Sequence, residues 1–198
     1  MRNLKKPWFA KGLYIILFFF LSPFVMAQSP VTVAVFNEST SMPLSPPKIG
    51  PFHPGVLTGS DITLYESDRN KTYVSINISY TFHKKLYQAI TIGLNLGYDY
   101  KMTYGGSLKT GIGIGYMHTF PVREIYSFQS TEYGLKKAKG NSRFIPSVSF
   151  GIGQRFSPND FKSSELFVQQ QYWLEIPYSP GFIPIMSHAN TILGAKFP

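Results

Sequence analysis

The sequence predicts an all-β fold, an eight-stranded antiparallel up-and-down transmembrane β-barrel, and three observations favour it. Apolar and small polar residues alternate with a period of two over consecutive runs, which is the pattern of strands with one apolar face. Charged residues make up 15% of the chain, against about 25% in a typical soluble domain, while aromatic residues make up 16%. The first 27 residues have the features of an export signal.

Residues 1–27 are predicted to be a cleaved secretory signal peptide. A basic start precedes an apolar run from Leu13 to Val25, and Ala27 supplies the small residue that a cleavage site before Gln28 requires. The apolar run is shorter than the ~20 residues of a membrane-spanning helix, and no later run reaches that length. We therefore expect an exported chain whose membrane attachment comes from its strands.

Residues 28–54 are predicted to be a proline-rich periplasmic lead-in to a barrel domain at 55–198. Six prolines occur in this stretch, with few charges. The segment "VTVAVF" at 31–36 has the composition of a short strand, which could pair with a neighbouring edge or with another chain. We expect a flexible lead-in as the simpler interpretation.

From Gly55 onward, alternating runs are separated by turn residues. In the clearest run, 88–102, isoleucine and leucine share one face, and glycine and asparagine share the other. Pro146 and Gln170 stand on otherwise apolar faces, where we expect a bulge or a register change. The eight predicted strands are 55–66, 71–83, 88–102, 107–119, 123–134, 143–156, 164–177 and 187–197, of which the first and the fifth alternate poorly.

Aromatic residues gather at the ends of these predicted strands. If the first strand runs upward, Phe82, Phe120, Phe156 and Phe197 lie at the lower rim, and Tyr73, Tyr98, Tyr100 and Phe144 lie at the upper rim. Two aromatic rings that flank an aliphatic band are typical of a barrel in a membrane. The apolar face is therefore expected to contact lipid, and the sheet must close because lipid offers no hydrogen bonds to a free edge.

The small and polar face is expected to surround a narrow, filled lumen without an open pore. Eight strands leave room for little more than side chains, and a buried charge has to be paired. A proton path or a ligand site is the alternative interpretation of the same residues. The predicted lumen network consists of Asn77, Asn95, Asp99, Lys109, Arg155, Gln169, Gln171, Glu175 and Lys196.

With this strand direction, the outer loops are 66–71, 103–107, 134–143 and 177–188. The third is basic, and its cations would attract the phosphates of lipopolysaccharide, although a solvated loop has the same composition. The fourth is apolar, which suits a position in the headgroup layer, over the barrel mouth or against a partner. The predicted lipopolysaccharide contacts are Lys136, Lys137, Lys139 and Arg143.

The last run, "NTILGAKFP", carries a terminal pattern in which Phe197 ends a strand that has Leu193 and Thr191 on the same face, with Pro198 beyond it. On this pattern and the strand count over 55–197, the chain resembles the small eight-stranded outer-membrane β-barrels of Gram-negative bacteria. "PFHPG" and "PYSPGFIP" are similar to segments of uncharacterised small barrels of the Bacteroidota type. The resemblance implies an outer-membrane location, with membrane lipid, lipopolysaccharide and an envelope protein as partners.

Lipid A deacylases resemble this chain in size and architecture, and the likeness makes His188 and Ser187 weak catalytic candidates. Those enzymes use a histidine with a serine two residues further on and an acidic group. Here Asn190 fills the serine position, and Ser187 is adjacent to His188, so that the two side chains of one strand face opposite sides. We therefore expect a rim histidine and a protein that is not an enzyme.

Charge and cysteine content narrow the remaining classes. Four of the 19 lysine and arginine residues lie in the predicted signal peptide, and the other 15 against 10 acidic residues give a net charge of +5. This scattered excess does not favour a nucleic-acid partner. The chain has no cysteine and no histidine pair at metal-ligand spacing, so we expect no cofactor and no metal.

Three functions remain after these exclusions. We expect an integral outer-membrane barrel with a structural or interaction role in the cell envelope. The first alternative is a lipid-modifying acyl hydrolase like the deacylases. The second is a soluble lipocalin-like periplasmic binder, in which the apolar face would lie inside the barrel.

Overall fold

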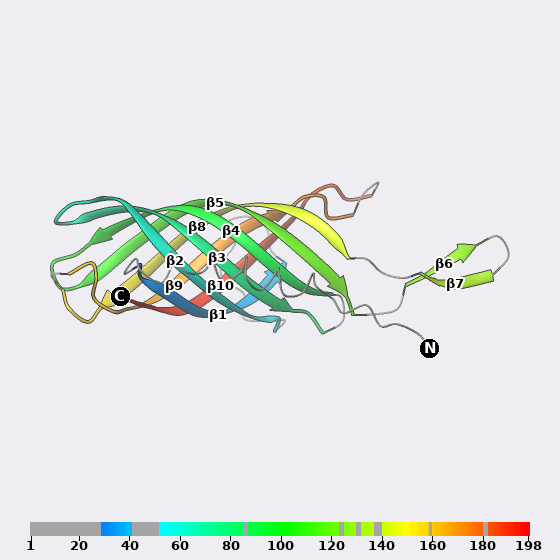
Figure 1. Ribbon diagram of the computed structural model, residues 1–198, viewed down its shortest axis with the longest axis horizontal. Coiled ribbons are helices and arrows are strands. Elements are labelled where there is room, and N and C mark those ends of the chain that lie inside the picture. Colours follow the sequence, from blue (N-terminus) through cyan, green and yellow to red (C-terminus); the bar gives the residue numbers. More distant parts are fainter. Residues whose placement is uncertain are drawn as a thin grey trace, which may run out of the picture.

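The computed structural model describes residues 29–40, 52–84, 87–122, 125–129, 132–136, 140–158, 160–179 and 182–198. Eight strands form a closed antiparallel barrel in the order β1–β10–β9–β8–β5–β4–β3–β2 (Figure 1). The barrel strands are β1 (Val31–Thr40), β2 (Pro54–Glu66), β3 (Asn70–Phe82), β4 (Tyr87–Lys101), β5 (Gly106–Pro121), β8 (Asn141–Arg155), β9 (Glu165–Glu175) and β10 (Met186–Phe197). Two shorter strands, β6 (Ile125–Gln129) and β7 (Glu132–Lys136), form a separate hairpin beyond one end of the barrel (Figure 1). Within the described residues, no helix is long and apolar enough to cross a membrane.

The alternation of the sequence becomes the two faces of the wall. On β4, Leu94 is 48% exposed on the outside of the barrel, whereas Asp99 is 1% exposed on the inside. On β5, Ile112 is 61% exposed outside, and Lys109 is buried inside. The apolar face is therefore the outer face, as predicted, and the soluble-binder alternative, which needs an apolar interior, is wrong.

The predicted lead-in 28–54 is wrong for residues 31–40, which form a strand of the barrel. Strand β1 closes the sheet by pairing with β10, where Val31 faces Phe197, and with β2, where Val31 faces Ser60. Valines alternate with Thr32, Ala34 and the buried Phe36, so the segment has the pattern of a strand. None of the six prolines of 28–54 lies between 31 and 40. The proline content that predicted a lead-in therefore describes only the residues on either side of this strand.

The predicted strand 123–134 is also wrong, because it contributes nothing to the barrel. Its described part belongs to the β6–β7 hairpin, which connects β5 to β8. The poor alternation of this run leaves it without an apolar face to turn toward lipid. Residues 1–28, which include the predicted signal peptide, lie outside the described residues, and that peptide stays a prediction.

The barrel contains the strand 31–40, which was not predicted, and lacks the predicted strand 123–134. The strands between these two segments therefore run in the direction opposite to the predicted one. We call the end at which Val31 pairs with Phe197 the termini rim; the turns 67–69, 102–105 and 156–164 also lie there. The opposite end, the loop rim, carries the connections 41–53, 83–86, 122–140 and 176–185. The predicted outer loops 66–71 and 103–107 therefore lie at the termini rim, away from 134–143 and 177–188.

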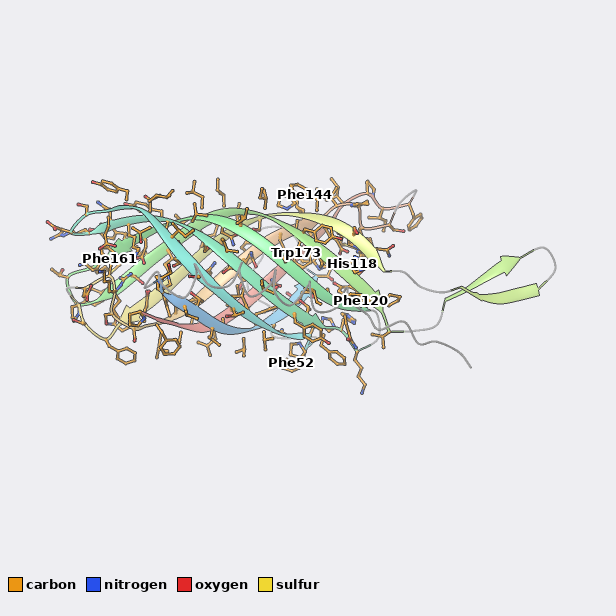
Figure 2. The ribbon with its side chains drawn as sticks, in the orientation of Figure 1. Phe52, His118, Phe120, Phe144, Phe161 and Trp173 are labelled. Atoms are coloured by element: carbon orange, nitrogen blue, oxygen red, sulfur yellow. The ribbon has the colours of Figure 1, made fainter. Side chains whose placement is uncertain are left out.

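Two aromatic rings are present, with a membership that follows this correction. Phe120 and Phe144 lie at the loop rim (Figure 2). Phe82, the last residue of β3, lies at the same rim. Tyr98, Tyr100, Phe156 and Phe197 lie toward the termini rim. Tyr73 belongs to neither ring, because it lines a cavity inside the barrel.

Pro146 and Gln170 do not produce the expected bulges. The β8–β9 ladder stops at Ser147↔Trp173 and resumes in the same register as the isolated bridge Phe144↔Ile176. Since proline has no N–H to donate, the result at Pro146 is a gap in the ladder. Gln170 pairs in unbroken register with Phe150 and Thr191. The register shift of this sheet occurs elsewhere, between Thr63 and Tyr65 on β2.

Candidate functional site

The candidate site is the lumen, because the inward faces of the strands carry most of the buried polar and charged side chains of this protein. Two ionic clusters lie near the two ends, and a polar section separates them. The termini cluster is Asp99, Lys109, Arg155 and Glu165. The loop cluster is Glu38, Arg143, Glu175 and His188.

The termini cluster joins four consecutive strands, β4, β5, β8 and β9. Asp99 faces Lys109 in register, and Arg155 faces Glu165. The Lys109 Nζ lies 2.9 Å from Asp99 Oδ2 and 2.8 Å from Glu165 Oε2. Arg155 pairs with Asp99 and lies 3.6 Å from Glu165 Oε2. Two cations thus balance two carboxylates, which is what burial of charge requires.

Further contacts extend this cluster toward β10 and β2. The Ser107 hydroxyl donates to Glu165, and Lys196 on the last strand pairs with Asp61 on β2. The Lys196 Nζ also lies 4.7 Å from the centre of the Tyr73 ring, within reach of a cation–π interaction. Gly97 leaves room for that ring, since a Cβ there would overlap it. Each buried cation near the termini rim therefore has an anionic partner and an ordered position.

Phe161, from the connection between β8 and β9, covers the termini cluster at the barrel end (Figure 2). Its ring centre lies 4.8 Å from the Arg155 guanidinium carbon and 4.6 Å from Lys101 Nζ. Although it comes from a loop, the side chain is buried. The ring thus separates the cluster from water while its face attracts the cations beneath it.

The loop cluster is built around an imidazole between two carboxylates. His188 Nε2 is hydrogen-bonded to Glu175 Oε2 at 2.9 Å, and Nδ1 lies 2.9 Å from Glu38 Oε1. Arg143 pairs with Glu175, and the Tyr87 hydroxyl donates to Glu38 at 3.2 Å. Because a carboxylate only accepts hydrogen bonds, His188 Nε2 donates to Glu175. Arg143 supplies a cation beside these glutamates.

The His188 ring is also fixed from its face. Trp173, labelled in Figure 2, stacks on it at 4.1 Å between ring centres and 11° between planes. The Trp173 Nε1 donates to Asn190 Oδ1 at 3.1 Å, and the Asn190 amide donates to Gln171 Oε1 at 3.1 Å. This chain of contacts links the loop cluster to the middle of the lumen.

The middle of the lumen contains two small polar cavities of about 70 and 60 Å³. They share Leu57, Asn77, Asn95 and Gln171 in their walls. Each has room for ordered water, which needs roughly 10–15 Å³ and several polar partners. Gly113 makes this section possible, because a Cβ there would overlap the Asn95 amide.

All nine residues of the predicted lumen network lie inside the barrel. Asp99, Lys109 and Arg155 meet in the termini cluster, Glu175 lies in the loop cluster, and Lys196 pairs with Asp61. Asn77, Asn95, Gln169 and Gln171 line the cavities. The members that sequence analysis missed are Glu38, Asp61, Ser107, Arg143, Glu165 and His188. Glu165 alternates in phase with Phe167 and Gln169, so its inward direction could have been predicted from the sequence.

The catalytic candidates are not arranged as a hydrolase site. His188 has two carboxylates beside it but is 4% exposed inside the lumen. Ser187 pairs with Leu174 in register, on the side of the strand opposite to His188. The imidazole therefore has an acidic partner, and β10 (Met186–Phe197) carries no serine on the face that includes His188.

The predicted lipopolysaccharide contacts separate into two groups. Arg143 is wrong as a surface cation, because its side chain turns into the lumen and pairs with Glu175. Lys137 and Lys139 lie outside the described residues, and Lys136 ends β7 without a described side chain. These three lysines stay a prediction.

A second histidine group lies at the loop rim. The rings of His53 and His83 stack at 3.7 Å, and the Tyr87 ring lies 5.7 Å from that of His83. Burial lowers the pKa of His83, and the neighbouring His53 lowers it further. Within the described residues, no group of three or more possible metal ligands occurs.

No family model and no curated protein matches the chain. Among solved structures, the fold is similar to Neisserial surface protein A (NspA), with 10% identity, a TM-score of 0.57, and coverage of 86% of this chain and 97% of that one. Ail, the attachment invasion locus protein of Yersinia pestis, matches with 11% identity and a TM-score of 0.50 over 85% of this chain and 96% of that one. The fold is that of a small outer-membrane barrel. The outer membrane enzyme PagL matches with 12% identity and a TM-score of 0.49 over 85% of this chain and 99% of that one.

Proposed function

We propose that this chain is an integral β-barrel protein of a bacterial outer membrane, with a structural or interaction role in the cell envelope and no open pore. The observation that carries the proposal is the inversion of its two faces. Leucine and isoleucine are about half exposed on the outside, while Asp99, Glu165 and Glu175 are at most 2% exposed inside. A water-soluble protein would bury the first set and expose the second.

Membrane residence explains this inversion. The outer wall is an aliphatic band between two aromatic rings, the composition that a bilayer core and its two interfaces select. The closed sheet leaves no barrel strand with an unpaired edge, which is the condition for β-structure in lipid. Export through the predicted signal peptide 1–27 belongs to the same proposal and is supported by the sequence alone.

The filled lumen supports a role without solute transport. The two cavities together offer space for a few water molecules, and paired charges and Phe161 occupy the ends. An envelope role then comes from the outer wall and the loops. Contact of Lys136, Lys137 and Lys139 with lipopolysaccharide phosphates is part of the proposal and follows from their charge.

Paired substitutions on one strand test the proposal. Leu94→Arg places a charge at mid-depth on the outer wall and should lower the free energy of unfolding in vesicles by about 2–4 kcal/mol. Gly93→Ser, one residue away on the lumen side, should leave it nearly unchanged, because a Cβ at Gly93 makes only ordinary van der Waals contacts.

The same preparation gives a second measurement. A membrane barrel requires detergent or lipid for solubility, and its folded form migrates differently from the boiled form on a gel. Stability of Leu94→Arg equal to that of the unmodified chain, together with solubility in plain buffer, would show that the outer wall faces water and would reject the proposal.

A further inference from the structure

The outer wall carries a hydrogen-bonded polar pair where its other side chains are mostly apolar. Gln170 on β9 faces Thr191 on β10 in register, and the Thr191 hydroxyl donates to Gln170 Oε1 at 2.8 Å. The flanking residues of the same strands, Val168 and Leu193, are exposed outward. Since neighbours at i±2 share a face, Gln170 and Thr191 also point out of the barrel.

The register of the sheet gives the depth of this pair. Gln170 lies in the middle of β9 and belongs to a lateral row of paired residues that runs Tyr98, Thr110, Phe150, Gln170, Thr191, Asn37. The row begins near the termini rim and ends near the loop rim, because barrel strands tilt by roughly 35–45° from the axis. Gln170 therefore lies near the centre of the aliphatic band.

The Gln170 carboxamide has unused hydrogen-bonding capacity at this depth. It offers two N–H donors and two acceptor lone pairs, of which Thr191 occupies one. Within the part of the chain that the structure describes, the Nε2 group donates to no atom. The hydrocarbon core contains no water, and lipid carbonyl groups lie at its edges, so an unpaired amide in this position is costly.

We propose that this wall, which consists of the outer faces of β9 and β10, is a dimer interface between two copies of the chain in the membrane. The inference rests on the proposed membrane location. Copies inserted in the same direction are related by a two-fold axis along the membrane normal, so a residue near that axis meets itself at equal depth. A carboxamide suits such a contact, because each Nε2 donates to the free lone pair of the other Oε1.

The surroundings of the pair fit a packed protein contact. An apolar groove of about 600 Å³ lies beside it, lined by Leu108, Phe150, Ile152 and Val168 together with Gln170 and Thr191. Ala195 shares the outward face of β10 with Thr191 and is small. The second copy can therefore bring its wall close, and its outward side chains can enter the groove.

Cross-linking in vesicles tests the interface, and the absence of cysteine from the chain makes it specific. Val168→Cys puts a thiol next to the pair without removing it. Ile76→Cys is the matched control, since it lies at mid-strand on β3, opposite β9 in the barrel order. With a short bis-maleimide at low protein-to-lipid ratio, we expect Val168→Cys to give at least about fivefold more covalent dimer than Ile76→Cys.

A second variant tests the amide itself. Gln170→Leu added to Val168→Cys should reduce cross-linking to the level of Ile76→Cys, while heat-dependent gel mobility shows that the barrel still folds. Equal cross-linking of Val168→Cys and Ile76→Cys, or dimer that persists with Gln170→Leu, would overturn the interface. Failure of the unmodified chain to insert into vesicles would instead reject the membrane location.

Discussion

The two ends of the lumen are both filled with paired charges, but different side chains make the pairs. The termini cluster contains only aspartate, glutamate, lysine and arginine, and Phe161 covers it. The loop cluster depends on His188, and the other three histidines, His53, His83 and His118, also lie at the loop rim. Histidine is the side chain whose protonation ordinarily changes near neutral pH. The termini cluster is therefore built only from residue types that ordinarily keep their charge between about pH 5 and 8, and the histidines gather at the opposite end of the barrel.

The largest effect is expected from Lys109→Met in the termini cluster. The ammonium contacts both Asp99 and Glu165, so its removal leaves two buried carboxylates with Arg155 alone. Breaking a buried ion pair from one side typically costs about 3–5 kcal/mol. Urea unfolding of the folded barrel in vesicles measures this change, with Lys196→Met as a comparison that uncovers only one carboxylate. If Lys109→Met lowered the free energy of unfolding by less than Lys196→Met does, this result would contradict the idea that Lys109 neutralises two carboxylates.

A smaller effect is expected from His188→Gln in the loop cluster. The glutamine keeps one donor, and Arg143 and Tyr87 still face the two glutamates. We expect a loss of about 1.5–3 kcal/mol at neutral pH, the typical contribution of a hydrogen bond to a charged group. The same unfolding measurement applies. A loss larger than that of Lys109→Met would reverse the ranking of the two clusters.

The smallest effect is expected from acid at the loop rim. The pKa of His83 is lowered in the folded state, mainly by burial and then by His53, so the unfolded chain binds the proton more readily. The stability from His83 is complete above its ordinary pKa of about 6.5 and is lost as the pH falls toward the lowered value. We expect His83→Asn to flatten the fall in unfolding free energy between about pH 8 and 5. Gly93→Ser, which adds and removes no titratable group, serves as the control and should leave this slope unchanged.

Most of the wall could be predicted from the sequence because its signal is local. Alternation is a property of neighbouring residues, and it identified β3, β4, β5, β8, β9 and β10 together with the outward direction of their apolar faces. The same alternation also predicted which residues form the lumen network. Arg155 and Lys196 were expected inside for this reason, and both lie there.

The strand count was right although one counted strand, 123–134, was wrong and one barrel strand, 31–40, was not counted, and this error changed every prediction that depends on strand direction. The prolines around 31–40 outweighed the clear alternation within it, while 123–134 entered the count with little alternation. Closure by Val31–Thr40 is a long-range pairing that no local pattern reveals. Glu38 was missed because its strand was not counted, and Arg143 was missed because it was assigned to the basic outer loop although it alternates in phase with Arg155.

The pairing of Val31 with Phe197 has a kinetic consequence. It joins the first and last strands of the barrel, and contacts between residues far apart in the chain form slowly because the entropy of the intervening loop is lost first. Until that step, β1 and β10 each present a row of unpaired N–H and C=O groups, the kind of edge that recruits other strands. A helper in the assembly of this protein would therefore act by shielding these two edges until they meet.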